Sequence, residues 1–454
     1  MKVGFISLGC SKNLIDTEVL IGKFKQNNYQ IVNDEKEAEI LIINTCGFIE
    51  SAKEEAINTI FEMSRYKERK CKYLIVMGCL VQRYYAELVK EIPEVDLFLR
   101  LDEYDKMWEK VERLFNINKI EITNPISRKE MLRNPLPMFC NQEFLEREIT
   151  TGKNYAYLKI GEGCSNRCTY CAIPYIRGTF KSRPKEDIIA EARGLVQRGI
   201  KEIILIAQDT TKYGIDIYGK SLLHELLNEI AKINEVKIIR FLYSYPEGIT
   251  DELIEEVSRN DKVAKYFDIP IQHISNSILK KMNRRTSREN IEEIIYKIKK
   301  QIPDVVLRTS LIVGFPGETK EEFEELDSFV DNIGFDKLGV FKYSKEEGTP
   351  AEKMPNQIHF NTKRGRYNKI MKTQQKVSRN KLENKLNKEK LVLIENITFD
   401  NKFFVGRSKE DVPDIDGLVY IENDGKYKYA EVLNIFKAVN IVDYSDYDLI
   451  GKFT

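Results

Sequence analysis

The chain has 454 residues, of which 42% are apolar, so it is too long for one ordinary core and apolar enough to build several. Lys plus Arg number 72 and Asp plus Glu number 71, and this balance excludes a whole-chain argument for a polyanionic or membrane-surface partner. No apolar run approaches the ~20 residues of a membrane span, and eight cysteines in so long a chain do not form a secreted disulfide framework, so we expect a cytoplasmic protein with reduced thiols and no membrane partner.

Three apolar runs near the N-terminus each end at a cysteine. They are VGFISLGC, ILIINTC and YLIVMGC, which end at Cys10, Cys46 and Cys79. Strands that alternate with helices predict an α/β domain with a doubly wound parallel sheet over 1–125, and ligands of such sheets bind beyond the carboxyl ends of the strands. Because all three cysteines lie at that edge, we expect them to share a ligand site. Three separate buried thiols are the alternative.

A proline-containing stretch, NPISRKEMLRNPLPM, has no sustained period and predicts a linker over 126–152. Six further apolar runs follow, separated by amphipathic segments such as 185–198. The runs are YAYLKIGEGC, EIILIAQD, KIIRFLYS, YFDIPIQH, VVLRTSLIVGFPG and KLGVFKYS. Six β/α units predict a partial (β/α)6 barrel over 153–375, with an open side and with its active residues at the carboxyl ends of the strands.

The C-terminal part begins with a basic segment, 361–390, which has helical character and holds eleven Lys or Arg against two Glu. Its plain interpretation is a solvated helix face. Short β-branched and aromatic runs follow, among them KYAEVLNIF, and predict a small all-β barrel of about five strands. We place the helix end and this barrel in a third domain, 376–454. Residues 391–454 hold twelve Asp or Glu and seven Lys or Arg, so we expect a basic partner rather than a phosphate backbone.

The stretch EGCSNRCTYC, residues 162–171, contains Cys164, Cys168 and Cys171. A loop with this spacing can wrap three thiolates around one corner of an iron–sulfur cluster, and the missing fourth ligand leaves one iron open for a substrate or cofactor. Structural zinc normally needs four ligands in paired two-residue spacings, and a disulfide is disfavoured in a reducing compartment. Both remain as less favoured alternatives.

The motif Cys-x-x-x-Cys-x-aromatic-Cys after the first barrel strand resembles the signature of radical S-adenosylmethionine (SAM) enzymes, with Tyr170 at the aromatic place. The resemblance implies that SAM chelates the open iron and that one-electron reduction cleaves SAM to a 5′-deoxyadenosyl radical. It also implies SAM contacts from AQDTTKYG, PIQHIS and SLIVGFPGE. The residues concerned are Gln208, Asp209, Gln272, His273, Gly314 and Gly317.

Two arginines and two histidines near these motifs have open or plain interpretations. Arg308 lies on the fifth barrel strand, where it could reach SAM or form an ion pair inside the barrel. Arg177 follows the cysteine loop, where it could pair with a substrate carboxylate or cap the loop. His224 and His359 are expected to be structural.

The three cysteines of the N-terminal domain narrow the resemblance to methylthiotransferases, and the resemblance then covers nearly the whole chain, including a C-terminal module of the TRAM type. It implies a second [4Fe–4S] cluster on Cys10, Cys46 and Cys79, which faces the first and handles sulfur. The implied reaction replaces the hydrogen of an unactivated C–H bond by a methylthio group. One SAM methylates a sulfur and a second supplies the radical, with a low-potential flavodoxin- or ferredoxin-like electron donor.

The substrate branch is indicated by two stretches. SLGCSKNLIDTE and the tail VNIVDYSDYDLIGKF resemble the RimO-type branch, which modifies the β-carbon of an aspartate in the small-subunit ribosomal protein of the decoding centre. The MiaB-like branch, which modifies adenosine in tRNA, is the first alternative, and the basic helix mildly favours it. A metal-free RNA-binding protein and a two-cluster electron carrier are alternatives from other classes.

Overall fold

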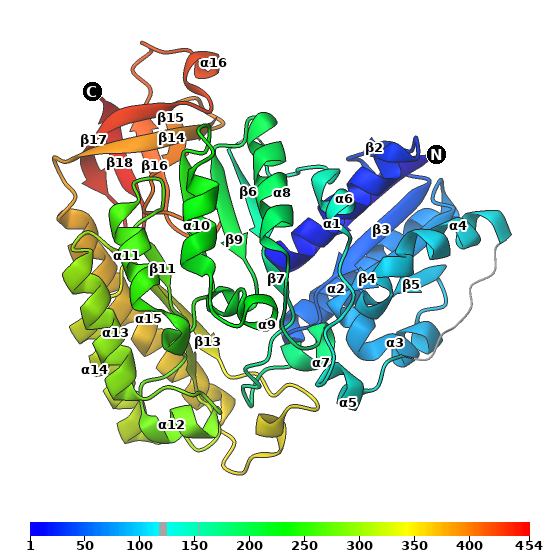
Figure 1. The fold of residues 1–454 in the computed structure, drawn as a ribbon, viewed down its shortest axis with the longest axis horizontal. Helices are drawn as coiled ribbons and strands as arrows, with labels where there is room; N and C mark the ends of the chain where they lie inside the picture. Colours follow the sequence, from blue (N-terminus) through cyan, green and yellow to red (C-terminus); the bar gives the residue numbers. More distant parts are fainter. Residues whose placement is uncertain (118–124, 153) are drawn as a thin grey trace.

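The computed structural model describes residues 1–117, 125–152 and 154–454. The chain builds an N-terminal sheet domain, a central barrel and a small C-terminal barrel, which lie against one another (Figure 1). The end of the predicted first domain, 118–124, and the predicted first residue of the second, Lys153, lie outside the described residues.

The N-terminal domain contains a five-stranded sheet in the order β2-β1-β3-β4-β5, in which every pair of neighbouring strands is parallel. Its central strand is buried along its whole length. Alternate residues of this strand therefore enter two cores, Ile40 and Ile42 on one face and Leu41 and Ile43 on the other. The strands are β1 (Lys2–Ser7), β2 (Gln30–Val32), β3 (Ile40–Thr45), β4 (Tyr73–Gly78) and β5 (Leu97–Leu99).

Helices cover both faces of this sheet. One core contains residues of α1 (Ser11–Gln26) and α4 (Met107–Ile117), and the other contains residues of α2 (Glu50–Ser64) and α3 (Cys79–Glu91). The doubly wound arrangement is therefore confirmed.

The segment predicted as a linker, 126–152, is packed against both neighbouring domains. It contains two short helices, α5 (Arg128–Met131) and α6 (Asn141–Leu145). Phe139 and Phe144 are buried in the core shared by α1 and the inner face of the central barrel, and the Arg147 side chain is completely buried. This connection therefore fixes the two domains to each other.

The central barrel has the six predicted parallel strands, in two three-stranded arcs with the orders β10-β9-β6 and β11-β12-β13. A parallel bridge between Ile239 and Val263 joins the arcs. Alternate residues of each strand face inward, as Ile204 and Ile206 do, or outward under the helices. The strands are β6 (Tyr155–Lys159), β9 (Glu202–Ile206), β10 (Ile238–Phe241), β11 (Tyr266–Asp268), β12 (Val306–Val313) and β13 (Lys337–Lys342).

Helices follow the barrel strands, and a two-stranded hairpin precedes the first long one. The hairpin pairs β7 (Gly161–Glu162) with β8 (Lys181–Ser182). The helices are α7 (Ile173–Arg177), α8 (Lys185–Gln197), α9 (Ile215–Tyr218), α10 (Leu223–Ala231), α11 (Asp251–Arg259), α12 (Asn276–Lys281), α13 (Arg288–Gln301) and α14 (Lys320–Ile333).

The basic segment forms one helix, α15 (Phe360–Glu383), so the predicted boundary at 375 falls inside a continuous helix. This helix lies beside α14, and three of its cations form ion pairs there: Arg366, Lys369 and Lys376 contact Glu318, Asp327 and Asp331. His359 caps the helix, since its Nδ1 accepts a hydrogen bond from the Asn361 backbone N–H. The basic segment therefore forms a helix that packs on the outside of the central barrel, against α14.

The C-terminal barrel is closed by five strands in the order β14-β15-β16-β18-β17. The run KYAEVLNIF, predicted as a strand, instead contains α16 (Tyr429–Val432), and the strand follows it, because Leu433 and Asn434 turn the chain. The strands are β14 (Glu389–Ile397), β15 (Phe403–Arg407), β16 (Val419–Glu422), β17 (Phe436–Tyr444) and β18 (Leu449–Phe453).

The loop between β15 and β16 reaches the amino ends of the central-barrel strands. Val412 is completely buried in the core lined by the inner face of that barrel. Asp411 pairs with Lys337 at 2.8 Å, and Asp416 accepts a hydrogen bond from the Tyr266 hydroxyl at 2.7 Å. The β15–β16 loop therefore joins the two barrels through one apolar contact and two polar contacts. Across the described residues, no helix has the length and hydropathy needed to cross a membrane.

Candidate functional site

The three N-terminal cysteines meet at the carboxyl edge of the sheet, as predicted. Cys10 follows β1 and caps α1, Cys46 follows β3, and Cys79 begins α3. Two glycines permit this approach. Gly9 has φ +92°, and a β-carbon there would lie 2.8 Å from the Cys46 β-carbon; Gly78 has φ +102°, and a β-carbon there would lie 2.3 Å from the Asn44 side-chain oxygen.

The three thiols differ in their electrostatic surroundings. Burial raises the pKa of the Cys79 thiol to about 12, and burial also raises the pKa of Cys46. Burial opposes ionisation of Cys10 as well, but the Lys12 ammonium and the Arg177 guanidinium hold its pKa below the usual value. Cys10 is nonetheless exposed to solvent. It is therefore accessible to solvent, and its thiolate is the most readily formed of the three.

The cysteine triplet lies in the loop after β6 and β7. The loop is closed by backbone hydrogen bonds from Cys164 N to Gly178 O and from Cys171 N to Cys168 O, both 3.0 Å long. The Cys168 sulfur lies 3.7 Å from the Tyr245 hydroxyl and 4.0 Å from an Arg284 guanidinium nitrogen. The triplet is thus held in a defined loop beside a buried cation.

Burial and mutual repulsion make these thiols poor acids on their own. Burial raises the pKa of Cys164 to about 12, and burial and the other two sulfurs raise that of Cys171 well above its usual value. A bound cation would reverse this by favouring the thiolates. Among the described residues, no group of three or more His, Cys, Asp and Glu side chains is arranged to hold a single metal ion. Cysteines that bind different irons of one cluster need not meet at one point, so this donor set fits an iron–sulfur cluster.

Gln208 and Asp209 lie after β9, directly behind the triplet. Gln208 donates a hydrogen bond to Glu162 at 2.9 Å, and its side-chain oxygen is buried without a partner among the described residues. Asp209 is completely buried and accepts from the side chains of Asn166 and Thr211, and burial raises its pKa. Gln208 therefore offers an unused acceptor to a ligand, whereas Asp209 shapes the loop.

Gln272 and His273 differ in their exposure. Gln272 has φ +68° and is half-buried. His273 is completely buried, with Glu322 of α14 and Arg366 of α15 as its charged neighbours, and burial lowers its pKa to about 3. The position of His273 in the helix layer does not favour the SAM contact predicted for it, and the contact predicted for Gln272 stays a prediction.

The remaining predicted SAM residues surround the same end of the barrel. Tyr170 packs with Phe315 and Tyr343, and burial raises its pKa well above the usual value. Gly314 has φ +72°, and a β-carbon there would lie 2.4 Å from the Lys363 side chain, so its glycine makes room for α15. Gly317 has φ +74° and forms a turn against Asn356.

The two arginines have internal partners. Arg308 forms an ion pair with Asp268 at 2.8 Å, which is the barrel-interior pair that its position left open. Arg177 is completely enclosed and donates to Glu162 at 2.8 Å and to Asn13 at 2.5 Å. A contact of Arg177 with a substrate carboxylate is therefore corrected to a contact between the two domains.

A buried polar network extends from Cys79 in the N-terminal domain to Glu162 and Gln208 in the central barrel. Asn13 accepts a 3.5 Å contact from the Cys79 sulfur, Arg177 joins Asn13 to Glu162, and Glu162 accepts from Gln208. Lys159 neutralises Glu162 from the other side, and these two cations hold the pKa of Glu162 well below its usual value despite burial. The pattern of the sequence did not indicate this network, because its members come from two domains.

Lys12 is a second site residue that the sequence pattern did not indicate. Its side chain is buried, and its ammonium lies 3.1 Å from the ring centroid of Tyr243. Burial lowers its pKa to about 8. The only sequence signal was its position two residues after Cys10.

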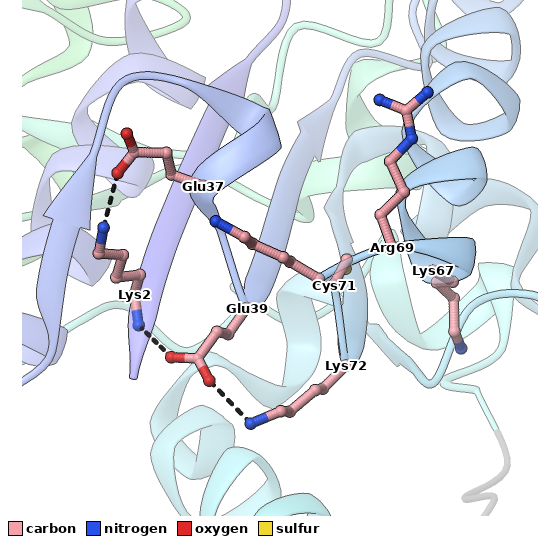
Figure 2. A pocket seen from close by; sticks show the side chains of 8 residues that line it. Lys2, Glu37, Glu39, Lys67, Arg69, Cys71 and Lys72 are labelled. Carbon is pink, nitrogen blue, oxygen red and sulfur yellow. Dashed lines mark hydrogen bonds and ion pairs between the residues drawn. The ribbon is translucent and has the colours of Figure 1, made fainter.

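A separate hollow of about 730 Å³ lies at the opposite, amino edge of the N-terminal sheet, as Figure 2 shows. Lys2 and Lys72 form ion pairs there with Glu37 and Glu39. Cys71 lies in this hollow, far along the strand direction from Cys79 at the other end of β4. The hollow is therefore distinct from both groups of cysteines.

Three sequence families match the chain. They are described as the uncharacterized protein family UPF0004, over residues 2–100, the radical SAM superfamily, over 158–330, and the TRAM domain, over 388–453. Together they cover the three structural domains in order.

Two similar full-length relatives share the same description, ribosomal protein uS12 methylthiotransferase RimO. The protein from Alkaliphilus oremlandii is 55% identical, with 100% of this chain and 99% of the relative covered. That from Acetivibrio thermocellus is 49% identical, with 99% and 98% covered.

Solved structures support the fold. The radical SAM methyltransferase TsrM from Kitasatospora setae, with cobalamin and a [4Fe–4S] cluster bound, superimposes with a TM-score of 0.57 at 12% identity, covering 77% of this chain and 73% of that one. The cobalamin-dependent SAM radical enzyme OxsB gives a TM-score of 0.52 at 12% identity, covering 83% of this chain and 56% of that one.

Proposed function

Because the chain belongs to the RimO family of ribosomal protein uS12 methylthiotransferases, we propose that it inserts a methylthio group at the β-carbon of an aspartate in uS12. The net change breaks one C–H bond and forms one C–S bond. SAM is both the methyl donor and the source of the hydrogen-abstracting radical. Ordinary acid–base side chains do not break such a bond, which is why a radical cofactor is needed.

An iron–sulfur cluster and SAM follow from membership of the radical SAM superfamily. We assign the cluster to Cys164, Cys168 and Cys171, and propose a second one on the N-terminal thiols Cys10, Cys46 and Cys79. When bound, the two clusters would supply an electron to the sulfonium and a sulfur to the substrate.

The chain's own residues position these groups. The Cys164 loop is closed on Gly178, and the Arg284 cation beside Cys168 stabilises thiolate charge there. Gln208 would offer its unpartnered oxygen to the amino group of SAM, and the half-buried Gln272, in the segment after the fourth strand, would be a second contact. Tyr170, Asp209, Gly314 and Gly317 shape that pocket, His273 supports it from the helix layer, and Arg308 holds Asp268 beneath it.

The substrate and electron supply complete the proposal. The C-terminal barrel would hold the basic ribosomal protein near the open side of the central barrel, and a flavodoxin- or ferredoxin-like protein would deliver electrons at low potential. We expect both partners, and hence this enzyme, in the cytoplasm, where ribosomal proteins are made.

The observation that carries the proposal is the similarity to RimO relatives over the full chain. The hydrogen-bonded connection from the Cys79 thiol through Asn13, Arg177 and Glu162 to Gln208 supports it, because it joins the N-terminal cysteine site to the strand ends of the central barrel. The test is to incubate anaerobically reconstituted protein with reductant, SAM, sulfide and uS12. We expect uS12 to gain about 46 Da, the mass of a methylthio group less the hydrogen it replaces. A gain on tRNA nucleosides with none on uS12 would overturn the substrate assignment.

The tRNA alternative is not favoured by the charges. The helix α15, which provided the basic segment, directs Arg366, Lys369 and Lys376 to carboxylates of its own chain. These three cations are therefore partly compensated and less available to phosphates.

A further inference from the structure

We propose that Lys12 binds the side-chain carboxylate of the substrate aspartate. This inference rests on the proposed function and adds the residue that selects the substrate side chain. Lys12 lies in the first turn of α1, two residues after the solvent-exposed Cys10.

Lys12 is a buried cation that contacts no carboxylate among the described residues. Its side chain is 6% exposed, and within the described residues its ammonium makes neither a hydrogen bond nor an ion pair. Its close contact is the face of Tyr243, at 3.1 Å from the ring centroid. An ammonium has three donors, and a buried unpaired one is costly, so the position indicates an anion that is supplied from outside the chain.

The carboxylates nearest to Lys12 are already neutralised by other cations. Glu162 is paired with Arg177 at 2.8 Å and with Lys159 at 2.9 Å. Asp268 is paired with Arg308 at 2.8 Å and accepts the Tyr243 backbone N–H at 2.9 Å. Both acids act on Lys12 only through space. Cys10 also attracts Lys12 through space, but it makes no direct hydrogen bond with the ammonium among the described residues, so the three donors of Lys12 are available to a ligand.

Tyr243, on which Lys12 rests, is itself held in an uncommon conformation. Its φ is +64°, in the left-handed region that bulky residues seldom adopt. Its backbone N–H is fixed by Asp268, and its carbonyl accepts from the Thr210 backbone N–H at 3.1 Å. Such conformations persist where the surroundings enforce them, and they concentrate at ligand sites. Here the strained residue presents a flat ring beneath the ammonium.

The position also suits the reaction. The carboxyl carbon of an aspartate is bonded directly to the β-carbon. A carboxylate bound to Lys12 would therefore place the β-carbon roughly 4–5 Å from the ammonium nitrogen. Cys10 lies two residues from Lys12, and Tyr245, two residues after the Tyr243 ring that Lys12 contacts, lies 3.7 Å from the Cys168 sulfur. The β-carbon would therefore lie between the two groups of cysteines. Lys12 therefore acts as a substrate-binding residue that sets which carbon reacts.

The test compares two peptides that span the modified aspartate of uS12, one with Asp and one with Asn at that place. Binding to the anaerobic, cluster-loaded protein is followed by fluorescence anisotropy. We expect the wild type to bind the Asp peptide about 30-fold or more tightly than the Asn peptide, as for a desolvated charge pair. In Lys12→Met the ratio should fall to about threefold or less, mainly through weaker Asp binding.

A matched control is Lys25→Met on the same helix, whose half-exposed side chain pairs with Glu148. This variant should keep the wild-type ratio. Lys12→Gln provides a second neutral side chain and should behave as Lys12→Met does. If Lys12→Met does not retain its iron, the comparison is made between Lys12→Gln and the wild type, again by the ratio of their affinities for the Asp and Asn peptides.

Two results would overturn the inference: a wild type without preference for the Asp peptide, or an undiminished preference in the Lys12 variants. The second would make Lys12 a counter-charge for the Cys10 thiolate instead. The proposed function is judged separately, because the gain of about 46 Da on the Asp peptide by the wild type does not depend on which residue binds the carboxylate.

Discussion

Arg147 connects three parts of the chain, and its removal tests whether buried charge holds the domains together. Its guanidinium lies 2.7 Å from Glu18 of α1 and 2.9 Å from Glu191 of α8, and it donates to the Tyr157 carbonyl of β6. All of these side chains are buried. Arg147→Met keeps the length of the aliphatic chain but removes the charge.

The expected cost follows from what each partner retains. Glu18 still accepts from the Thr150 backbone N–H and hydroxyl, and Glu191 still pairs with Arg183 at 2.6 Å. Breaking a buried pair costs about 3–5 kcal/mol, and we expect the lower end, about 3 kcal/mol, because of these remaining contacts. This free energy corresponds to an increase in local opening on the order of 100-fold.

The assay is hydrogen–deuterium exchange of the anaerobic, cluster-loaded protein, read on peptides from α1 and β6. Arg379→Met is the control, since its pair with Asp446 is largely exposed and is worth less than about 1 kcal/mol. Burial raises the pKa of Glu18, so protonation of Glu18 favours the folded state. The loss of stability caused by Arg147→Met should therefore be complete at pH 8, where Glu18 is charged, and should become smaller as the pH falls toward 4.5. Exchange in Arg147→Met within about threefold of the wild type would refute the reasoning.

Three further predictions concern the clusters, the C-terminal barrel and a buried carboxyl group. Alanine at any triplet cysteine should abolish release of 5′-deoxyadenosine from SAM, whereas alanine at Cys10 should preserve release and stop methylthiolation; Cys140→Ala is the control, and identical behaviour of the two sets would contradict the division of roles. Glu202→Gln leaves Arg240 and Arg407 buried without their shared carboxylate, so the free energy of opening measured by hydrogen exchange in β15 and β16 should fall by about 3–5 kcal/mol. In the control, Glu422→Gln at an exposed pair, this free energy should change by less than about 1 kcal/mol. Burial raises the pKa of Glu318 to about 7, so the stability of the wild type relative to Glu318→Gln should fall as the pH rises from 4.5 to about 7 and stay constant above it; parallel unfolding midpoints at pH 5, 6 and 7 would exclude this.

The fold follows closely from the sequence where periodicity was strong. Continuous apolar runs such as 40–43 had to be strands covered on both faces, and the cysteine after each run then had to lie at one edge. The six runs of the central barrel and the five-stranded closure of the last domain were predicted on the same basis.

The contacts between domains did not follow from the sequence. Arg147 and Glu18 are separated by 129 positions, so no local pattern connects them. The charge excess of the last domain was also misleading as a physical argument, because Asp411, Asp414 and Asp416 bond to residues of the central barrel instead of facing a partner. Counting charges does not show which way they point, and the assignment to uS12 depends on the similarity to relatives.

The seating of the β15–β16 loop in the floor of the central barrel has a mechanical consequence. With Val412 enclosed and Asp411 and Asp416 bonded beneath the strands, the C-terminal module has no hinge at this point. A segment of ribosomal protein bound by that module, as proposed above, would be held at a constant distance from the reacting centre. The enzyme would then select its target by the distance between the bound segment and the modified residue as well as by chemistry.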